Sequence, residues 1–413
     1  MSPGRIAFIE TSLGGSGLLA MRKARDLGAQ VLFLTRGRDY YDARGEVFPA
    51  PPDPVDDLVT CDTFDSVAVA GVLAGRAVDA VVSPGEYFVA VAAQAARLVG
   101  ARGLAPEAAA AVRDKEVTSR RCAAAGLPVP RSVPVGPDDE LDRARSVGFP
   151  CVVKPVDGAA SAGVAFCESD SDLRAAVQAV RAAAVTARGQ LRPRRAVVTE
   201  YVPGAEVSVE TISHDGVTDV LACTDKHVAG LPHFVEIGHT VPAALTPATR
   251  SACARLAVAA LAAVSFDLGV AHVEIKLGPD GPVLLEVNGR PAGDRIPELV
   301  RLAYGTDLLR DWVRVHLGLA PQPRPAAEPR AASIRYLTAA PGTVARATGV
   351  ELAGRVPGVV AAALEVAAGD QVGPLEDSHG RVGWVVATGP DAATAERAAE
   401  VGCGQLCVRI AGA

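Results

Sequence analysis

The chain has 413 residues, which exceeds the size that one hydrophobic core usually supports, and we expect about two to three domains. Hydrophobic residues make up 49% of the sequence and charged residues 21%, which is typical of a folded globular protein and excludes an intrinsically disordered one. The formal net charge of −6 provides no general positive field for nucleic acid, and no apolar run reaches the roughly 18 residues of a membrane span.

The first predicted unit covers residues 1–104. The segment RIAFIETSLGGSGLLAMRKARDLGAQVLFLTR has the pattern of a strand, a glycine-rich turn, a helix and a second strand, and VDAVVSPGEYFVAVAAQAARLVGA repeats the strand and the helix. Strands that alternate with helices of this length predict a parallel α/β sheet. The turn contains Gly14, Gly15, Ser16 and Gly17 but lacks the full GxGxxG spacing, so tight strand-to-helix packing is favoured over a phosphate contact.

A change of character near residue 105 predicts a second domain over residues 105–317. Its smaller lobe, over about residues 115–200, contains the strand PCVVKPV, the loop DGAASAGV, a helix and the strand AVVTEYV. Its larger lobe, over about residues 201–317, contains the strands EVSVETIS and VLACTDKHV, a helix over residues 247–264, and the strands AHVEIKL and VLLEVNG. The order of strand, small-residue loop, helix and strand is typical of a small α/β lobe.

The last part of the chain begins with GLAPQPRPAAEPRA, residues 318–331. Its proline and alanine content predicts a semi-extended linker. Residues 332–413 contain short strand patterns such as RVGWVVATG and the helical pattern DAATAERAAEVG, which predict a small C-terminal α/β domain.

The stretch VLLEVNGRP places Glu286, Asn288 and Arg290 at every second position, so their side chains share one face of a strand. Asp280-Gly281 predicts a tight turn from the preceding strand, and strand pairing then brings Glu274 to the same face. A solvated edge strand would also explain this polar row. Adjacent carboxylates repel one another without a cation, and together with an amide they form oxygen ligands that suit Mg²⁺ with bound phosphates.

Groups suited to phosphate binding occur earlier in the chain. Lys154 interrupts the apolar strand CVVKPV, where an unpaired ammonium would be costly, and Lys115 precedes a helix. The small residues of the loop 157–163 would let backbone N–H groups approach phosphate oxygens closely, whereas the sequence contains no Walker A motif. A surface position or an ordinary ion pair is the alternative for each lysine.

The segment TEYVPGAEVSVE predicts a strand that stops at Pro203-Gly204. We expect this stop to leave backbone groups around Glu200, Tyr201 and Val202 without ladder partners, and an adenine edge can pair with such groups. Glu206 can accept hydrogen bonds from ribose hydroxyls. A hairpin bend with a solvated glutamate is the alternative.

Taken in this order, the motifs resemble the ATP-grasp superfamily over about residues 105–317, and the preceding residues resemble the α/β domain that usually accompanies it. The resemblance implies an ATP-grasp fold, ATP as the phosphoryl donor and Mg²⁺ as the metal, with Mn²⁺ as an alternative ion. It implies catalytic roles for Arg290 and Lys154. The implied ATP contacts are Lys115, Lys154, Ser161, Gly163, Glu200, Tyr201, Val202 and Glu206, and the implied metal ligands are Glu274, Glu286 and Asn288.

Less general residues indicate the substrate. The segment PHFVEIGHTVPAALTP carries Glu236 and His239, and Arg295 closes the segment NGRPAGDR. An amino acid would suit such a site, because an acid can bind its amino group and Arg290 and Arg295 can bind its carboxylate. A surface loop is the alternative for Glu236 and His239. The segments FVEIGH, AHVEIKL and EVNGRPAGD and the C-terminal domain resemble the L-amino acid ligase branch. Biotin-dependent carboxylases are a poorer match, because no biotinyl-lysine motif of the Met-Lys type is found.

This resemblance implies an ADP-forming carboxylate–amine ligase of specialised metabolism. Such an enzyme activates an amino acid carboxylate as an acyl phosphate and joins it to an amine, which gives a dipeptide or an amide. The alternatives are an acyl ligase with a carrier-protein or other non-amino-acid acceptor, a nucleotide-binding protein without turnover and, more weakly, a carboxylase that uses bicarbonate.

The expected partners are small-molecule carboxylates and amines, with neither nucleic acid nor membrane. Dimers are common among similar proteins, so a homodimer is compatible with the resemblance. The N-terminal segment lacks a signal-peptide pattern, and the eight cysteines form neither a CxxC pair nor a zinc-spaced cluster. We therefore expect a cytoplasmic protein with reduced thiols.

Overall fold

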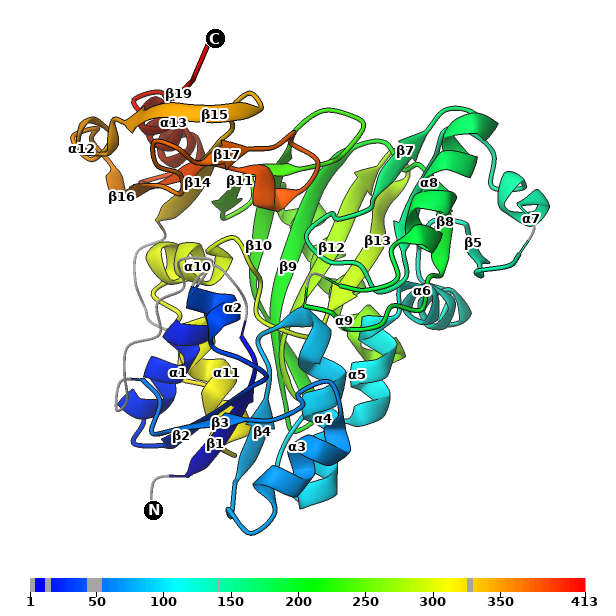
Figure 1. Cartoon of the computed structure of the whole chain (residues 1–413), viewed down its shortest axis with the longest axis vertical. Helices are drawn as coiled ribbons and strands as arrows, with labels where there is room; N and C mark the ends of the chain where they lie inside the picture. The colour runs from blue at the N-terminus through cyan, green and yellow to red at the C-terminus, as the bar shows by residue number, and fades with distance from the viewer. Residues whose placement is uncertain are drawn as a thin grey trace.

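The N-terminal residues form a four-stranded parallel sheet that is covered by helices on both faces (Figure 1). The structure, a computed structural model, describes residues 4–11, 16–42, 54–139, 141–186, 188–324 and 330–412. Side chains alternate along the first strand, so Ile6 and Phe8 pack on one face while Ala7 and Ile9 pack on the other. In sheet order the strands are β3 (Asp57–Thr60), β2 (Gln30–Thr35), β1 (Arg5–Ile9) and β4 (Ala80–Val82). The helical elements are α1 (Ser16–Asp26), α2 (Asp39–Asp42), α3 (Ser66–Leu73), η1 (Glu86–Phe88), α4 (Val89–Val99) and α5 (Pro106–Arg113).

The smaller lobe is built on a four-stranded antiparallel sheet. Ser169 caps the N-terminus of its longest helix and forms a capping box with Asp172, which fixes where that helix starts. The strands in sheet order are β5 (Ser132–Val135), β8 (Ala196–Glu200), β6 (Cys151–Pro155) and β7 (Ala165–Cys167), with helices α6 (Lys115–Ala124), α7 (Asp142–Arg145) and α8 (Asp170–Ala182).

An antiparallel sheet of eight strands forms the centre of the molecule. Its strand order is β13 (Gly281–Asn288), β12 (Gly269–Gly278), β9 (Ala205–His214), β10 (Val217–Val228), β11 (Glu236–Val241), β14 (Ala331–Leu337), β18 (Gly383–Gly389) and β16 (Val359–Leu364). Helix α9 (Pro247–Ala263) lies between β11 and β12 in the chain. Helices α10 (Ile296–Tyr304) and α11 (Leu308–His316) follow β13. Because β11 pairs with β14, one sheet continues from the larger lobe into the C-terminal residues.

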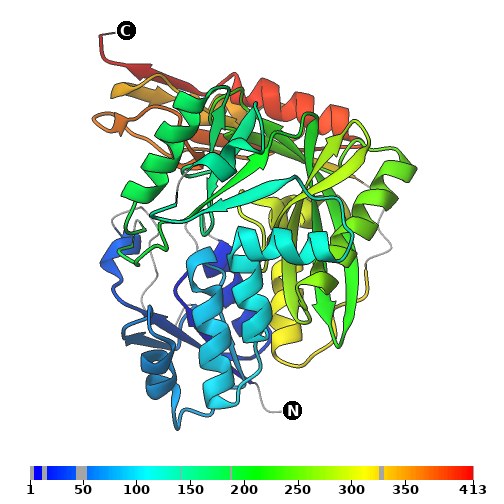
Figure 2. The same ribbon diagram turned by 90° about the vertical axis from the view of Figure 1, so that its right-hand side faces the viewer.

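The C-terminal residues add a smaller three-stranded sheet of β17 (Gln371–Val372), β15 (Gly342–Thr348) and β19 (Cys407–Ile410), together with α12 (Val350–Ala353), η2 (Ser378–Gly380) and α13 (Ala392–Cys403). Figures 1 and 2 show the N-terminal sheet at one end of the molecule and these C-terminal elements, coloured orange to red, at the other. Within the described residues, no helix combines the length and the apolar character that a membrane crossing requires.

Several predictions from the sequence can be compared with this fold. The parallel N-terminal sheet and the hairpin across Asp280-Gly281 are confirmed, and the helix expected over residues 247–264 is α9. Gly14 and Gly15 of the predicted turn, and residues 325–329 of the predicted linker, lie outside the described residues. At Gly17 a Cβ atom would lie 1.5 Å from Oγ1 of Thr11, so this glycine does allow the close packing that was expected.

A buried ion pair joins the N-terminal sheet to the smaller lobe. The Glu10 carboxylate is fully buried at the end of β1, and Nη2 of Arg188 donates to it over 2.6 Å. Hydroxyl groups of Thr35 and Thr63 donate to the same carboxylate at 2.8 and 2.6 Å. The Arg188 guanidinium also lies over the ring of Tyr40, 4.1 Å from its centroid. Since Arg188 comes from the connection between α8 and β8, this contact fixes the smaller lobe against the N-terminal sheet.

We predict that Arg188→Ala lowers the free energy of unfolding by about 3 kcal/mol or more, because it leaves the buried Glu10 carboxylate without its cation. Urea denaturation followed by circular dichroism would measure the change. Arg97→Ala is the control, since the pair Arg97–Glu107 is largely exposed and should contribute less than about 1 kcal/mol. Equal losses of stability in the two variants would contradict the prediction.

Candidate active site

The hairpin of β12 and β13 brings the predicted metal ligands together. In the register of the two strands Glu274 lies directly opposite Glu286, and His272 lies opposite Asn288. Nδ2 of Asn288 donates to Oε1 of Glu274 over 3.3 Å. Two carboxylates and one amide therefore face the same cleft, as the alternation in the sequence predicted.

A buried lysine that the sequence interpretation missed neutralises this acidic group. Nζ of Lys226, on β10, lies 2.6 Å from Glu206, 2.7 Å from Glu274 and 3.4 Å from Glu236. Burial alone would lower the pKa of Lys226, but Glu206, Glu274 and Glu236 raise it well above its usual value. The local signal was weaker than for Lys154, because Lys226 stands between Asp225 and His227 in VLACTDKHV, whereas Lys154 follows two valines in CVVKPV.

Glu274 has a second cationic neighbour in His272. Burial alone would raise the pKa of Glu274, but Lys226 and His272 hold it well below its usual range. Burial alone would lower the pKa of His272, whereas Glu210 and Glu274 raise it to about 10. The carboxylate is therefore ionised and able to bind a cation at neutral pH.

The two predicted phosphate lysines also line the cleft. Nζ of Lys115 lies 2.9 Å from Oε1 of Glu286 and donates to the carbonyl of Gly158 over 2.7 Å. Burial lowers the pKa of Lys154, and the nearby Lys115 adds to this effect while Glu286 opposes it. An anion placed between these ammonium groups would relieve both costs, because it would supply negative charge where water is excluded.

The small-residue loop between β6 and β7 lines the cleft beside these lysines. Ala160 and Ser161 have φ values of 55° and 59°, in the left-handed region that residues with side chains rarely adopt. Ser161 lines the cleft and its hydroxyl donates to the carbonyl of Phe234 over 3.5 Å. Gly163 has a φ of 77° and packs against Pro155 rather than lining the cleft. Strained backbone of this kind is found at ligand-binding loops.

The far end of the cleft is lined by Tyr201, Val202, Val152 and Leu285, an apolar surface of the kind that accepts a flat ring. One expectation about this end is wrong for two of the backbone N–H groups. The N–H groups of Glu200 and Tyr201 already donate to the carbonyls of Arg131 and Pro150 at 3.0 and 3.3 Å. Strand β8 ends at Glu200, before Pro203, and the residues that precede β5 and β6 satisfy these donors.

Glu200 and Glu206 both line the cleft but differ in their partners. The Glu200 carboxylate pairs with Arg131 at 2.7 Å, toward solvent. Glu206 is bound by two lysines, Lys226 at 2.6 Å and Lys276 at 3.4 Å. Of the two, Glu206 is the carboxylate that the surrounding charge holds within the cleft.

The N-terminal domain contributes Glu86, which sequence interpretation also missed. Its carboxylate accepts from Nε of Arg290 at 2.5 Å and from Nη1 of Arg113 at 2.6 Å. Burial alone would raise the pKa of Glu86, but Arg290, Arg113 and Lys115 lower it to about 2. No local signal in SPGEYF marks this residue, because its partner Arg290 lies 204 positions away.

The predicted substrate residues are only partly brought together. Glu236 and Arg290 line the cleft, whereas His239 and Arg295 are not among its lining residues. Nε2 of His239 is hydrogen bonded to Asp294 at 3.0 Å. Arg295 pairs with Glu298 and stacks on Trp384, because its left-handed backbone, with a φ of 59°, turns the side chain toward the C-terminal residues. The expectation that Arg295 contacts the substrate is therefore not met by its position.

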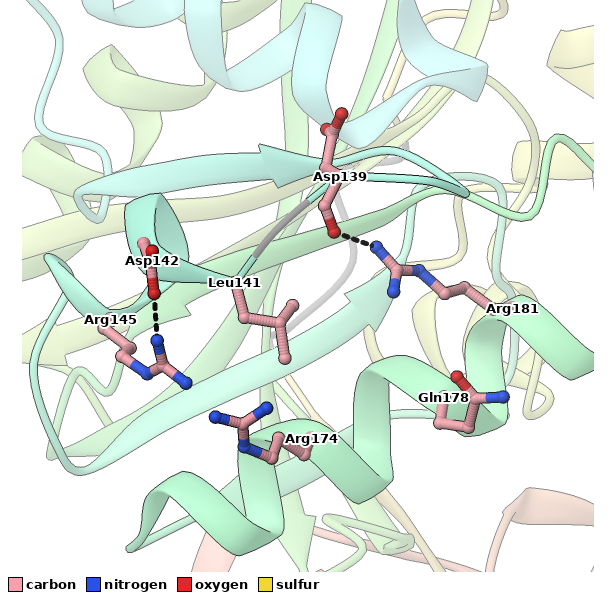
Figure 3. Close-up of a pocket in the computed structure, with 7 residues that line it drawn as sticks. All are labelled: Asp139, Leu141, Asp142, Arg145, Arg174, Gln178 and Arg181. Atoms are coloured by element: carbon pink, nitrogen blue, oxygen red, sulfur yellow. Dashed lines mark hydrogen bonds and ion pairs between the residues drawn. The ribbon is translucent and has the colours of Figure 1, made fainter.

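A second, more open cavity of about 530 Å³ lies in the smaller lobe, near α7 and α8 (Figure 3). Its arginines already have partners: Arg145 pairs with Asp142 and Asp170, Arg174 pairs with Asp170, and Arg181 donates to backbone carbonyls. The lining holds three arginines and two aspartates, and Asp170 beside it supplies a third carboxylate, so little charge is left over for a ligand. The cleft between the lobes is the better candidate.

Comparison with known proteins agrees with this fold. The ATP-grasp domain family matches residues 147–298, and the family described as L-amino acid ligase C-terminal domain 2 matches residues 335–411. The crystal structure of L-amino acid ligase from Bacillus licheniformis superposes with a TM-score of 0.81 at 21% identity and covers 98% of both chains.

Two curated relatives share part of the sequence. Carnosine synthase 1 of Gallus gallus is 33% identical over 49% of this chain and 23% of its own length. D-alanine–D-alanine ligase of a Mycobacterium species is 33% identical over 48% of this chain and 56% of its own length. The chain thus spans less than two thirds of the length of these relatives.

The fold and the cleft together define an ATP-grasp protein, with a parallel N-terminal domain followed by antiparallel sheets. More particularly, residues 335–411 match the C-terminal domain of L-amino acid ligases, and the chain is similar to carboxylate–amine ligases of the ATP-grasp type.

The cleft also fits the cation that ATP-grasp enzymes typically use. Mg²⁺ is commonly held by one or two carboxylates, with phosphates and water as the remaining ligands, and Glu274, Glu286 and Asn288 can supply such a set. The described residues contain no cluster of three or more His, Cys, Asp or Glu side chains arranged as a complete metal site. The three ligands stay a prediction.

We predict that Glu86→Gln lowers the free energy of unfolding at pH 7 by about 3 kcal/mol. Because the pKa of Glu86 falls from its ordinary value of 4.5 to about 2 on folding, its stabilisation is complete above pH 4.5 and is lost as the pH falls toward 2. Denaturation of both proteins at several pH values would show the difference shrinking over that range. Glu107→Gln, at an exposed carboxylate, should show no such dependence, and a constant difference for Glu86→Gln would contradict the assignment.

Proposed function

We propose that the protein is an ATP-dependent, ADP-forming ligase that activates an amino acid carboxylate as an acyl phosphate and joins it to an amine. The observation that carries this proposal is the convergence of the acids of β12 and β13, the lysines of the smaller lobe and Arg290 on one cleft. Such a cleft combines a site for a triphosphate and its cation with an arginine for a second anion. The names of the relatives support amino acids as the substrates.

In the proposed reaction an oxygen of the substrate carboxylate attacks the γ-phosphorus of ATP, and the bond to ADP breaks. Lys154 and Lys115 would neutralise the phosphate oxygens, and Arg290 would hold the carboxylate or the transferring group. Mg²⁺, when bound, would add charge neutralisation at the phosphates. The chain's main task is positioning, because phosphoryl transfer needs little covalent help from protein groups.

In the second step the nitrogen of the amine attacks the acyl carbon, phosphate leaves and the nitrogen loses a proton. The acyl phosphate must be kept from water until this happens. The loop 157–163 lines the cleft beside the lysines and would serve as the lid. Glu236, which lies at 3.4 Å from Lys226 and lines the cleft, would bind an ammonium group of a substrate.

We expect purified protein to release ADP from ATP and Mg²⁺ when a pool of all proteinogenic amino acids is present, and far less without the pool. Mass spectrometry of the same mixture should reveal a product whose mass equals two amino acids minus water. Turnover only with an acyl carrier or bicarbonate would indicate the corresponding alternative. Nucleotide binding without ADP release under any condition would indicate a binding protein.

Two substitutions test the placement of the site. Glu286→Gln should lower metal-dependent turnover about 10²-fold, because it removes charge at the expected cation site, and Lys154→Ala should weaken ATP binding measured by calorimetry. Matched controls are Glu351→Gln, at an exposed position of α12, and Lys23→Ala, at a surface ion pair with Asp307. Wild-type rates and affinity in both site variants would show that the site has been misplaced.

A further inference from the structure

The segment that follows the cleft strand β13 is held in a strained conformation. Asp294 and Arg295 are consecutive residues with φ values of 53° and 59°, although neither is glycine. A left-handed backbone at a residue with a side chain costs on the order of 1 kcal/mol or more, and persists only where the surroundings hold it. The contacts that hold this turn therefore indicate what it is for.

Two residues of the C-terminal domain make those contacts. Nη1 and Nη2 of Arg381 donate to the two carboxylate oxygens of Asp294 at 2.7 and 2.6 Å, a bidentate pair. The guanidinium of Arg295 lies 3.7 Å from the ring centroid of Trp384. The guanidinium of Arg381 itself stacks on Tyr336, at 3.7 Å from the ring centroid, and this contact restricts its orientation.

The same part of the C-terminal domain reaches the substrate side of the cleft. Oγ of Ser378 donates to Oε2 of Glu236 over 2.7 Å, and Nη1 of Arg381 donates to the Glu236 carbonyl over 3.1 Å. The N–H of Ser378 also approaches the carbonyl of Ala160 in the lid loop, at 3.5 Å. In Figure 1 the C-terminal domain lies beside β11, the strand that begins at Glu236.

Asp294 passes this restraint on to His239. Nε2 of the buried His239 is hydrogen bonded to Asp294 at 3.0 Å, and its N–H donates because a carboxylate oxygen can only accept. Nδ1 has no hydrogen-bond partner within the part of the chain that the structure describes. The contact with Asp294 is therefore the one that sets the orientation of this ring.

We propose that Arg381 is a positioning residue for the amino acid site, which it orders through Asp294, His239 and Glu236. This inference rests on the proposed function and extends it, because it assigns the C-terminal domain a part in substrate binding. Within the described ranges, Arg381 contacts Glu236, Asp294 and Tyr336, and none of these is among the expected ATP contacts, so we expect it to act on the amino acid site.

The test separates the two ligands. We expect Arg381→Ala to raise KM for the amino acid about tenfold or more while KM for ATP stays within about twofold, and Arg381→Lys to restore part of the loss. Arg346→Ala, at an exposed arginine of β15, is the matched control and should change neither constant. Equal changes in both KM values, or no change in either, would overturn the proposal.

A double-mutant cycle tests the route through Asp294. If Arg381 acts by holding Asp294, then Asp294→Ala with Arg381→Ala should raise KM for the amino acid no further than either single change does. Independent, multiplying effects would mean that Arg381 acts on the substrate by another route. Thermal melting of each variant would show that it is folded, and Arg381→Lys keeps the test available if Arg381→Ala does not fold.

A measurement that does not depend on enzymatic turnover distinguishes failure of this inference from failure of the proposed function. The ¹⁵N NMR signals of the His239 ring report its tautomer, and His239→Gln identifies them. Arg381→Ala should shift these signals even if the wild-type protein proves inactive toward amino acids. Unchanged His239 signals in Arg381→Ala would overturn the positioning role whatever the reaction is.

Discussion

Two carboxylates facing one another in a water-poor cleft are the constraint on which the rest of the site depends. Glu274 and Glu286 are placed side by side by the register of β12 and β13, and carboxylates at such positions repel one another unless cations surround them. Lys226 and Lys115 supply that charge at 2.7 and 2.9 Å. A cleft charged in this way is prepared for ligands that bring both signs of charge, such as a nucleotide with its metal ion.

Charged contacts join the parts of the fold that surround the cleft. The N-terminal domain contributes Glu86, which pairs with Arg290, and the C-terminal domain contributes Arg381, which pairs with Asp294. Glu10 and Arg188 fix the smaller lobe against the N-terminal sheet. The loop 157–163, which we propose as the lid, belongs to that lobe. A lid suits the proposed reaction, since its acyl phosphate intermediate must be kept from water.

The continuous central sheet explains why the C-terminal domain can influence the substrate side. Strand β11, which carries Glu236 and His239, pairs directly with β14 of the C-terminal domain, and that domain also binds Asp294 through Arg381. The position of Arg295 has the same origin. Its backbone turns it toward Trp384, so the arginine that the motif suggested for substrate instead stabilises the turn that carries Asp294.

The sequence by itself determined the class of fold and the polar face of the cleft, because those features depend on local periods. Alternation along VLLEVNGRP puts Glu286, Asn288 and Arg290 on one face, and Asp280-Gly281 fixes the hairpin that adds Glu274. Only the tertiary structure decided which buried charges meet. Glu86 lies 204 positions from Arg290, and Arg381 lies 87 positions from Asp294, so neither pair leaves a local pattern. The backbone donors of Glu200 and Tyr201 were misjudged for the same reason, since their acceptors belong to segments packed beside them. A residue's spacing determines its face, but its partner is determined by packing between segments that are remote in the chain.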